Sequence, residues 1–93
     1  MKLATGPGQV YFARSGDRVK IGYSRNPEAR IAGLNCSSAY PIAVVFSFEG
    51  TQAIEMGLHE RFKKHRRHGE WFEWCQEIAD FCNPLSEQKR VAS

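Results

Sequence analysis

The sequence predicts a small α+β domain: a three-stranded antiparallel sheet flanked by helices, in the order β-β-α-β-α-α. Two β-forming segments joined by a turn signal come first, a short apolar run lies near the middle, and segments with helical spacing fill the rest. The 93 residues, 42% of them hydrophobic and 25% charged, suit one globular domain. We expect a flexible arm at 1–8, the domain at 9–84 and a frayed tail at 85–93.

The first half predicts a hairpin followed by a helix. Val10–Arg14 is rich in β-forming residues, and Arg18–Tyr23 alternates apolar with polar or small side chains. Residues 15–17, Ser-Gly-Asp, supply the turn between them. Asn26 precedes a proline and a glutamate, which predicts a helix cap, and the helix should then run to Leu34.

The second half predicts one strand and two helices. Ile42–Phe48 is the most apolar run, and we interpret it as the central or most buried strand. Thr51 should cap a longer helix that fades near Arg66, and Cys75–Phe81 should form a short last helix. Helical spacing in the longer helix predicts a buried stripe made of Ile54, Leu58 and Phe62.

Basic residues are concentrated in one segment although the net charge is only +3. Residues 61–68 read RFKKHRRH, and an acidic stretch without basic residues follows at 73–87. A basic stripe of this kind suits an anionic polymer such as DNA, and it equally suits a solvated helix end. The residues that would contact nucleic acid are Arg61, Lys63, Lys64, Arg66 and Arg67.

The cysteines indicate a reducing compartment. Cys36, Cys75 and Cys82 are odd in number and lack the spacing of a disulfide framework, so we expect a cytoplasmic protein. No CxxC or HxxxH pair supports a zinc site built from these residues with His59, His65 and His68. No apolar stretch is long enough to span a membrane, and the first residues lack the apolar core of a secretory signal.

Four polar residues could serve phosphodiester chemistry, which needs a cation on the phosphate oxygens, a route to activate water and usually a divalent metal. Arg30 suits the phosphate, Tyr11 and Lys20 suit proton handling, and Glu55 suits Mg²⁺. We expect Glu55 on the polar side of its helix. Taken singly, each residue also fits an ordinary role as a packed aromatic ring or a solvated charge.

The order of these residues carries a resemblance. Val10-Tyr11-Phe12, then 20–24 (KIGYS), then 26–30 (NPEAR) look like the successive motifs of the GIY-YIG nuclease superfamily. The later segments 55–59 (EMGLH) and 69–72 (GEWF) are similar to the phage-type DNA-binding branch of that superfamily.

This resemblance implies a compact three-stranded sheet and metal-dependent cleavage of DNA phosphodiester bonds. It implies that Tyr11 helps activate water, that Arg30 holds the scissile phosphate and that Glu55 binds a single Mg²⁺ or Mn²⁺ ion. At Gly22 a side chain would crowd the site. Lys20 stands where the second tyrosine of the motif would be, so it is expected to position the nucleophile or to stabilise the phosphate.

Two further residues, Tyr23 and His59, are expected beside these groups in supporting roles. For His59, a contact to Glu55 and a helix-packing hydrogen bond are both open. The aromatic residues Trp71 and Phe72 favour packing, with stacking on exposed bases as the alternative.

Three functions therefore compete: a DNA endonuclease, a non-catalytic nucleic-acid-binding module, and a small interaction protein with an anionic protein partner. A pure binding module has no physical need for Glu55, which favours the enzyme. A chain of 93 residues leaves no room for a second, target-selecting domain, so a homodimer or a targeting partner would have to supply specificity.

Overall fold

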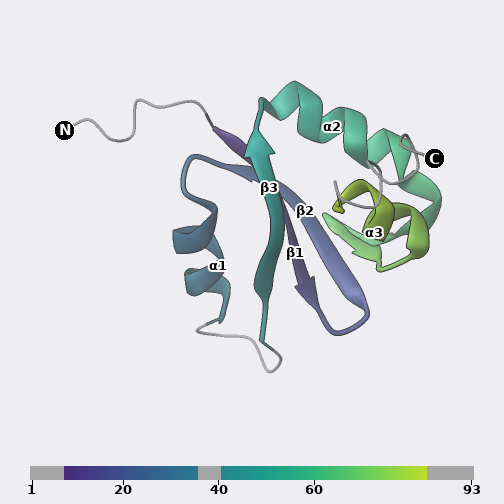
Figure 1. The fold of residues 1–93 in the computed structure, drawn as a ribbon, viewed down its shortest axis with the longest axis horizontal. Coiled ribbons are helices and arrows are strands. Elements are labelled where there is room, and N and C mark those ends of the chain that lie inside the picture. The colour runs from purple at the N-terminus through teal and green to yellow at the C-terminus, as the bar shows by residue number, and fades with distance from the viewer. Residues whose placement is uncertain (1–7, 36–40, 84–93) are drawn as a thin grey trace.

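The computed structural model describes residues 8–35 and 41–83, which form a five-stranded antiparallel sheet in the order β3-β1-β2-β5-β4 (Figure 1). The elements along the chain are β1 Gln9–Ser15, β2 Arg18–Ser24, α1 Pro27–Asn35, β3 Ala43–Glu49, α2 Gln52–Arg61, a 3₁₀ turn Lys63–His65, β4 Arg66–His68, β5 Trp71–Glu73 and α3 Gln76–Phe81.

The predicted α+β class is correct, but the predicted three-stranded sheet is wrong. Two short strands, β4 and β5, add to the outer edge of β2 and bring the sheet to five strands. Each is only three residues long, too short to show an alternating pattern. Gly69, between them, adopts φ 59°, a left-handed conformation that glycine reaches without strain, and this lets the chain reverse.

The hairpin and the two helix caps form as predicted. β1 and β2 pair antiparallel from Gln9 opposite Ser24 to Ser15 opposite Arg18. The Asn26 side chain accepts a hydrogen bond from the Ala29 N–H at 3.2 Å, and Thr51 does the same for Ile54 at 3.3 Å. These side chains satisfy backbone donors that the first helical turn leaves unpaired.

The prediction that Ile42–Phe48 forms the central or most buried strand is wrong. The corresponding strand, β3, is an edge strand that pairs only with β1, and β2 occupies the centre of the sheet. Its residues alternate between exposed and partly buried, and Val45 is 44% exposed. A continuous apolar run therefore indicated a strand correctly but overstated its burial.

Each face of the sheet carries its own core. On one face α2 and α3 cover a large cluster that includes Phe12, Ile21 and Phe72, all fully buried. On the other face α1 covers a smaller cluster that includes Tyr11 and Ile31. Side chains alternate between the faces of a strand, so neighbours in β1 and β2 serve different clusters.

The longer helix is shorter than predicted. α2 ends at Arg61, and residues 63–68 continue as a 3₁₀ turn and β4. Leu58 and Phe62 are buried as expected, whereas Ile54 is 43% exposed, so the predicted stripe of three is wrong at its first member.

Several expectations concern residues outside the described ranges. The predicted arm, apart from Gly8, the tail at 85–93 and Cys36 all lie there. Within the described residues, no helix is long and apolar enough to cross a membrane.

Two substitutions in and just after α2 test this packing. Phe62→Ala is expected to lower the free energy of unfolding by about 3–5 kcal/mol, because it empties a fully buried position between the sheet and α3. Ile54→Ala should change it by less than about 1 kcal/mol, since the side chain is largely exposed. Urea denaturation of both variants measures the difference, and equal losses would contradict the observed helix orientation.

Candidate functional site

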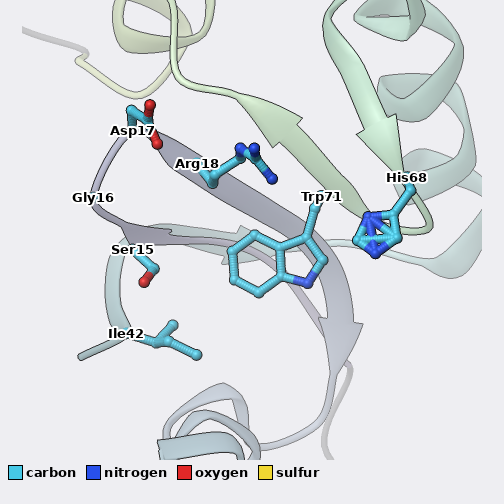
Figure 2. Close-up of a pocket in the computed structure, with 7 residues that line it drawn as sticks. All are labelled: Ser15, Gly16, Asp17, Arg18, Ile42, His68 and Trp71. Carbon is cyan, nitrogen blue, oxygen red and sulfur yellow. The ribbon is translucent and has the colours of Figure 1, made fainter. Parts of the chain in front are cut away.

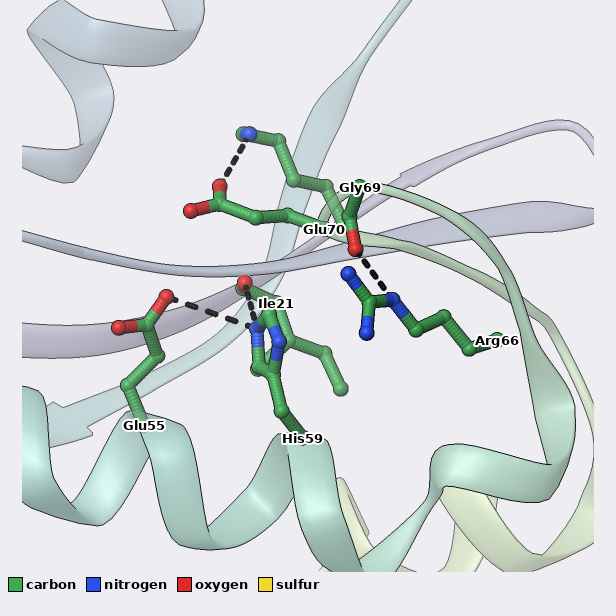
Figure 3. A network of polar contacts seen from close by, with 7 residues as sticks. Ile21, Glu55, His59, Arg66, Gly69 and Glu70 are labelled. Carbon is green, nitrogen blue, oxygen red and sulfur yellow. Dashed lines mark hydrogen bonds and ion pairs between the residues drawn. The ribbon is translucent and has the colours of Figure 1, made fainter.

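The site lies where the pairing between β2 and β5 stops. β5 pairs with β2 only from Arg18 to Lys20, and in the described chain no strand continues this edge. The Ile21 N–H instead donates to the Glu70 carbonyl at 3.1 Å, and His59 Nε2 lies 2.9 Å from the Ile21 carbonyl oxygen (Figure 3). Because a carbonyl only accepts, the imidazole proton belongs on Nε2. The backbone of β2 is thus satisfied at an edge that side chains from α2 can reach.

The carboxylate of Glu55 lies at this edge. Glu55 comes from α2, and its side chain points with His59 toward Ile21 (Figure 3). The residue is only 7% exposed, so the expectation that it lies on the polar side of its helix is wrong. Its Oε2 lies 3.5 Å from His59 Nε2. His59 therefore makes both of the contacts that the sequence left open, one to Glu55 and one to the backbone of β2.

The environment of Glu55 disfavours its charge. Burial is the main cause that raises the pKa of this carboxyl, and the nearby Glu70 carboxylate raises it further. The charges of His59 and Lys20 act in the opposite direction without cancelling the effect. A carboxylate in such a position costs the fold stability at neutral pH.

Glu70 completes the cluster, and sequence reasoning did not assign it a role in the site. Lys20 Nζ donates to Glu70 Oε1 at 2.5 Å. Glu70 follows Gly69, whose carbonyl accepts a hydrogen bond of 2.8 Å from Arg66 Nε, so the β4–β5 turn is anchored on both sides. The glycine at position 69, just before the aromatic segment 71–72, could have indicated the turn of a hairpin. No hairpin was predicted there.

Tyr11 lies on the same face of the sheet as Lys20. Its residue in β1 is paired with Gly22 in β2, and it is 1% exposed. A Cβ atom on Gly22 would lie 2.6 Å from the Tyr11 hydroxyl oxygen, much closer than such atoms approach. Glycine is therefore needed here so that the ring can lie across β2, which agrees with the expected crowding at Gly22.

The Tyr11 phenol keeps its proton at neutral pH. Burial is the largest influence and raises the pKa of the phenol, the positive charge of Arg30 lowers it, and the carboxylates of Glu70 and Glu55 raise it. These influences show that three groups predicted from the sequence, Tyr11, Arg30 and Glu55, lie near one another and near Glu70. Arg30 itself is exposed, on α1.

Tyr23 is the predicted residue that the structure does not bring to this cluster. It packs with the core under α2, on the face opposite Tyr11. Its hydroxyl lies close to Gly8, where an added Cβ would be 2.1 Å away. Tyr23 therefore supports the start of β1 from the other face.

The five basic residues between 61 and 68 are exposed, but they are spread over three elements instead of one helix. Lys63 pairs with Glu60 at 2.8 Å and Arg67 pairs with Glu73 at 3.3 Å. The Arg61 guanidinium lies over the rings of Phe62 and Phe81 at 5.3 and 5.1 Å. Lys63 and Arg67 are thus paired with carboxylates, and the role of this surface stays a prediction.

The donor set at the site fits a magnesium-type ion and not zinc. Among residues 8–35 and 41–83, no three His, Cys, Asp or Glu side chains come together as a metal cluster. Cys75 and Cys82 are free thiols, and burial raises the pKa of Cys82 to about 12. Glu55 and Glu70 supply two carboxylates, which is enough for Mg²⁺, because that ion usually keeps several waters and adds substrate phosphate oxygens.

The fold and the site together define a small α+β domain with a cluster of acidic, basic and phenolic groups at a sheet edge. The family model of the T5orf172 domain matches residues 8–84, so the chain belongs to the T5orf172 domain family. Assignment to the GIY-YIG nuclease superfamily from the motifs is therefore corrected to this different family. No curated protein and no solved structure matches the chain.

Replacing Glu55 should stabilise the fold. Glu55→Gln removes a charge that burial and Glu70 disfavour, so the free energy of unfolding at pH 7 should rise. The pKa of Glu55 in the folded protein lies above the usual 4.5. The gain in stability from the substitution is therefore complete above the pKa of the folded state and fades as the pH falls toward 4.5. We expect a rise in Tm of a few degrees, since about 1 kcal/mol corresponds to about 4–8 °C in a small domain.

Thermal melts at several pH values measure this effect. Glu60→Gln, in the same helix, is the matched control: Glu60 is exposed, and its hydrogen bond with Lys63 lowers its pKa, so removing its charge brings no gain. A Tm for Glu55→Gln below that of the parent at pH 7 would contradict the electrostatic account of this site.

Proposed function

We propose that this protein is a metal-dependent endonuclease that hydrolyses DNA phosphodiester bonds at the cluster of Tyr11, Lys20, Arg30, Glu55 and Glu70. The observation that carries the proposal is the buried Glu55 carboxylate beside a second carboxylate. Burial and the neighbouring Glu70 carboxylate both disfavour the ionised form of Glu55, and a cation bound beside the two carboxylates would offset that cost. Carboxyl groups whose pKa is raised by burial and by a neighbouring carboxylate are often found at functional sites.

Glu55 and Glu70 are the residues that would hold Mg²⁺ or Mn²⁺. The ion, when bound, supplies Lewis-acid stabilisation of the charge that develops on the phosphate. Without such an ion, the carboxylates of Glu55 and Glu70 would repel an anionic substrate. Lys20, hydrogen-bonded to Glu70, keeps that carboxylate oriented and adds a positive charge on the same side of the sheet.

The remaining residues act on the phosphate and on water. Arg30 is exposed, and its guanidinium can hold two phosphate oxygens through its fixed pair of donors. The neutral Tyr11 phenol can donate a hydrogen bond to a phosphate oxygen or accept one from the attacking water. Because Tyr11 keeps its proton and the Lys20 ammonium donates to Glu70, these residues position water in this state and do not act as free bases.

The alternative is a non-catalytic nucleic-acid-binding module, and the exposed basic residues 61–68 favour it as much as they favour a nuclease. The buried Glu55 carboxylate separates the two functions, because phosphate binding alone gains nothing from it. We also propose that a homodimer or a targeting partner supplies the specificity. We propose a cytoplasmic location for the protein.

Nicking of supercoiled plasmid DNA tests the nuclease. The parent protein is expected to nick in Mg²⁺ or Mn²⁺ and not in EDTA. Glu55→Gln should lose at least about 100-fold in rate, the scale of losing one transition-state contact, while its Tm stays at or above that of the parent.

Glu60→Gln, on the exposed surface of the same helix, should nick like the parent. Nicking by Glu55→Gln at the parental rate would disprove the site. Absence of nicking by the parent, together with retention of DNA that weakens as salt rises, would favour the binding module.

A further inference from the structure

A pocket of about 530 Å³ opens beside the cluster and takes no part in the chemistry above. Figure 2 shows the indole of Trp71 with Arg18 above it, His68 on one side, and Ser15 and Ile42 on the other. Gly16 and Asp17, in the β1–β2 turn, complete its lining. Its volume falls within the range of about 300–1,000 Å³ typical of small-molecule sites.

The lining combines an aromatic ring with side chains that donate hydrogen bonds and side chains that accept them. Trp71 is half-buried and packs against the cluster under α1, which holds its ring in place. Arg18 and His68 can donate hydrogen bonds, and Asp17 and Ser15 can accept them. A flat heteroaromatic group with donors and acceptors on its edge fits this set: it can stack on the indole while its edge faces the polar side chains.

The pocket is connected to the proposed catalytic cluster through the sheet. Trp71 in β5 is the direct cross-strand partner of Lys20 in β2, and residues so paired have Cβ atoms about 5 Å apart. Lys20, which donates a hydrogen bond to Glu70, therefore lies next to the Trp71 ring that forms the pocket wall. A strand whose phosphate lies at the cluster can place an adjoining base in the pocket.

We propose that this pocket binds one unstacked nucleobase of a DNA strand whose phosphate occupies the catalytic cluster, so that the substrate is single-stranded or locally unpaired DNA. The inference rests on the proposed function for its position, but base binding itself requires no cleavage. Bases within a duplex are stacked on each other and cannot enter without being extruded.

Tryptophan fluorescence in EDTA tests the proposal without cleavage. Trp74 packs with the core on the opposite face, and Arg14 lies 4.4 Å from the centre of its ring, so Trp74→Phe leaves Trp71 as the single reporter. A single-stranded oligothymidylate should quench this fluorescence. It should also bind about 5- to 150-fold more tightly than an abasic strand of equal length and charge, the factor expected for stacking one base.

The matched variant Trp71→Phe keeps an aromatic ring in place and reports from Trp74, whose fluorescence should not respond to the strand. Equal binding of the abasic strand, or equal quenching by a blunt duplex, would overturn the proposal. If the parent does not nick plasmid DNA but the strand still quenches Trp71, the nuclease proposal fails and the base pocket stands as part of a binding module. If nicking depends on Glu55 but the strand does not quench Trp71, the nuclease proposal stands and the pocket proposal fails.

Discussion

The arrangement of the site depends on the backbone of Ile21. β5 stops pairing with β2 at Lys20, and from there the edge of β2 is completed by the Glu70 carbonyl and the His59 imidazole instead of a strand. These two contacts satisfy the buried backbone while leaving space for side chains. A longer β5 would continue the ladder and keep Glu55 away from the face that carries Tyr11. Because this three-residue strand ends early, side chains from α2 can approach the residues on the face that carries Tyr11.

The charges gathered at this edge conflict in the absence of a ligand. Burial and Glu70 disfavour the ionised form of Glu55, while Lys20 satisfies only Glu70 directly. Natural folds accept such costs at sites that bind ions or transition states. A divalent cation at the two carboxylates and a phosphate beside Arg30 would resolve the conflict, and the aromatic pocket at Trp71 would extend the same surface along the DNA strand.

Local features of the sequence were enough to predict the hairpin and the caps at Asn26 and Thr51, because each depends on neighbouring residues. The cluster of Tyr11, Lys20, Arg30 and Glu55 was predicted only through motif order, and that order suggested a different family from the T5orf172 domain. β4 and β5, the edge position of β3 and the place of Glu70 could not be predicted from residue patterns. They depend on pairing between distant segments, and three-residue strands have no periodicity to detect.

We propose that Glu55 and Glu70 are held together to bind a divalent cation. The most direct test is the shift in Tm that Mn²⁺ produces at pH 7, in the parent and in Glu55→Gln. A ligand that binds only the folded state raises its stability in proportion to the logarithm of its concentration above Kd. We expect Mn²⁺ to raise the Tm of the parent in this way and to leave the Tm of Glu55→Gln unchanged. Equal shifts in both proteins, or none in the parent at millimolar Mn²⁺, would contradict it.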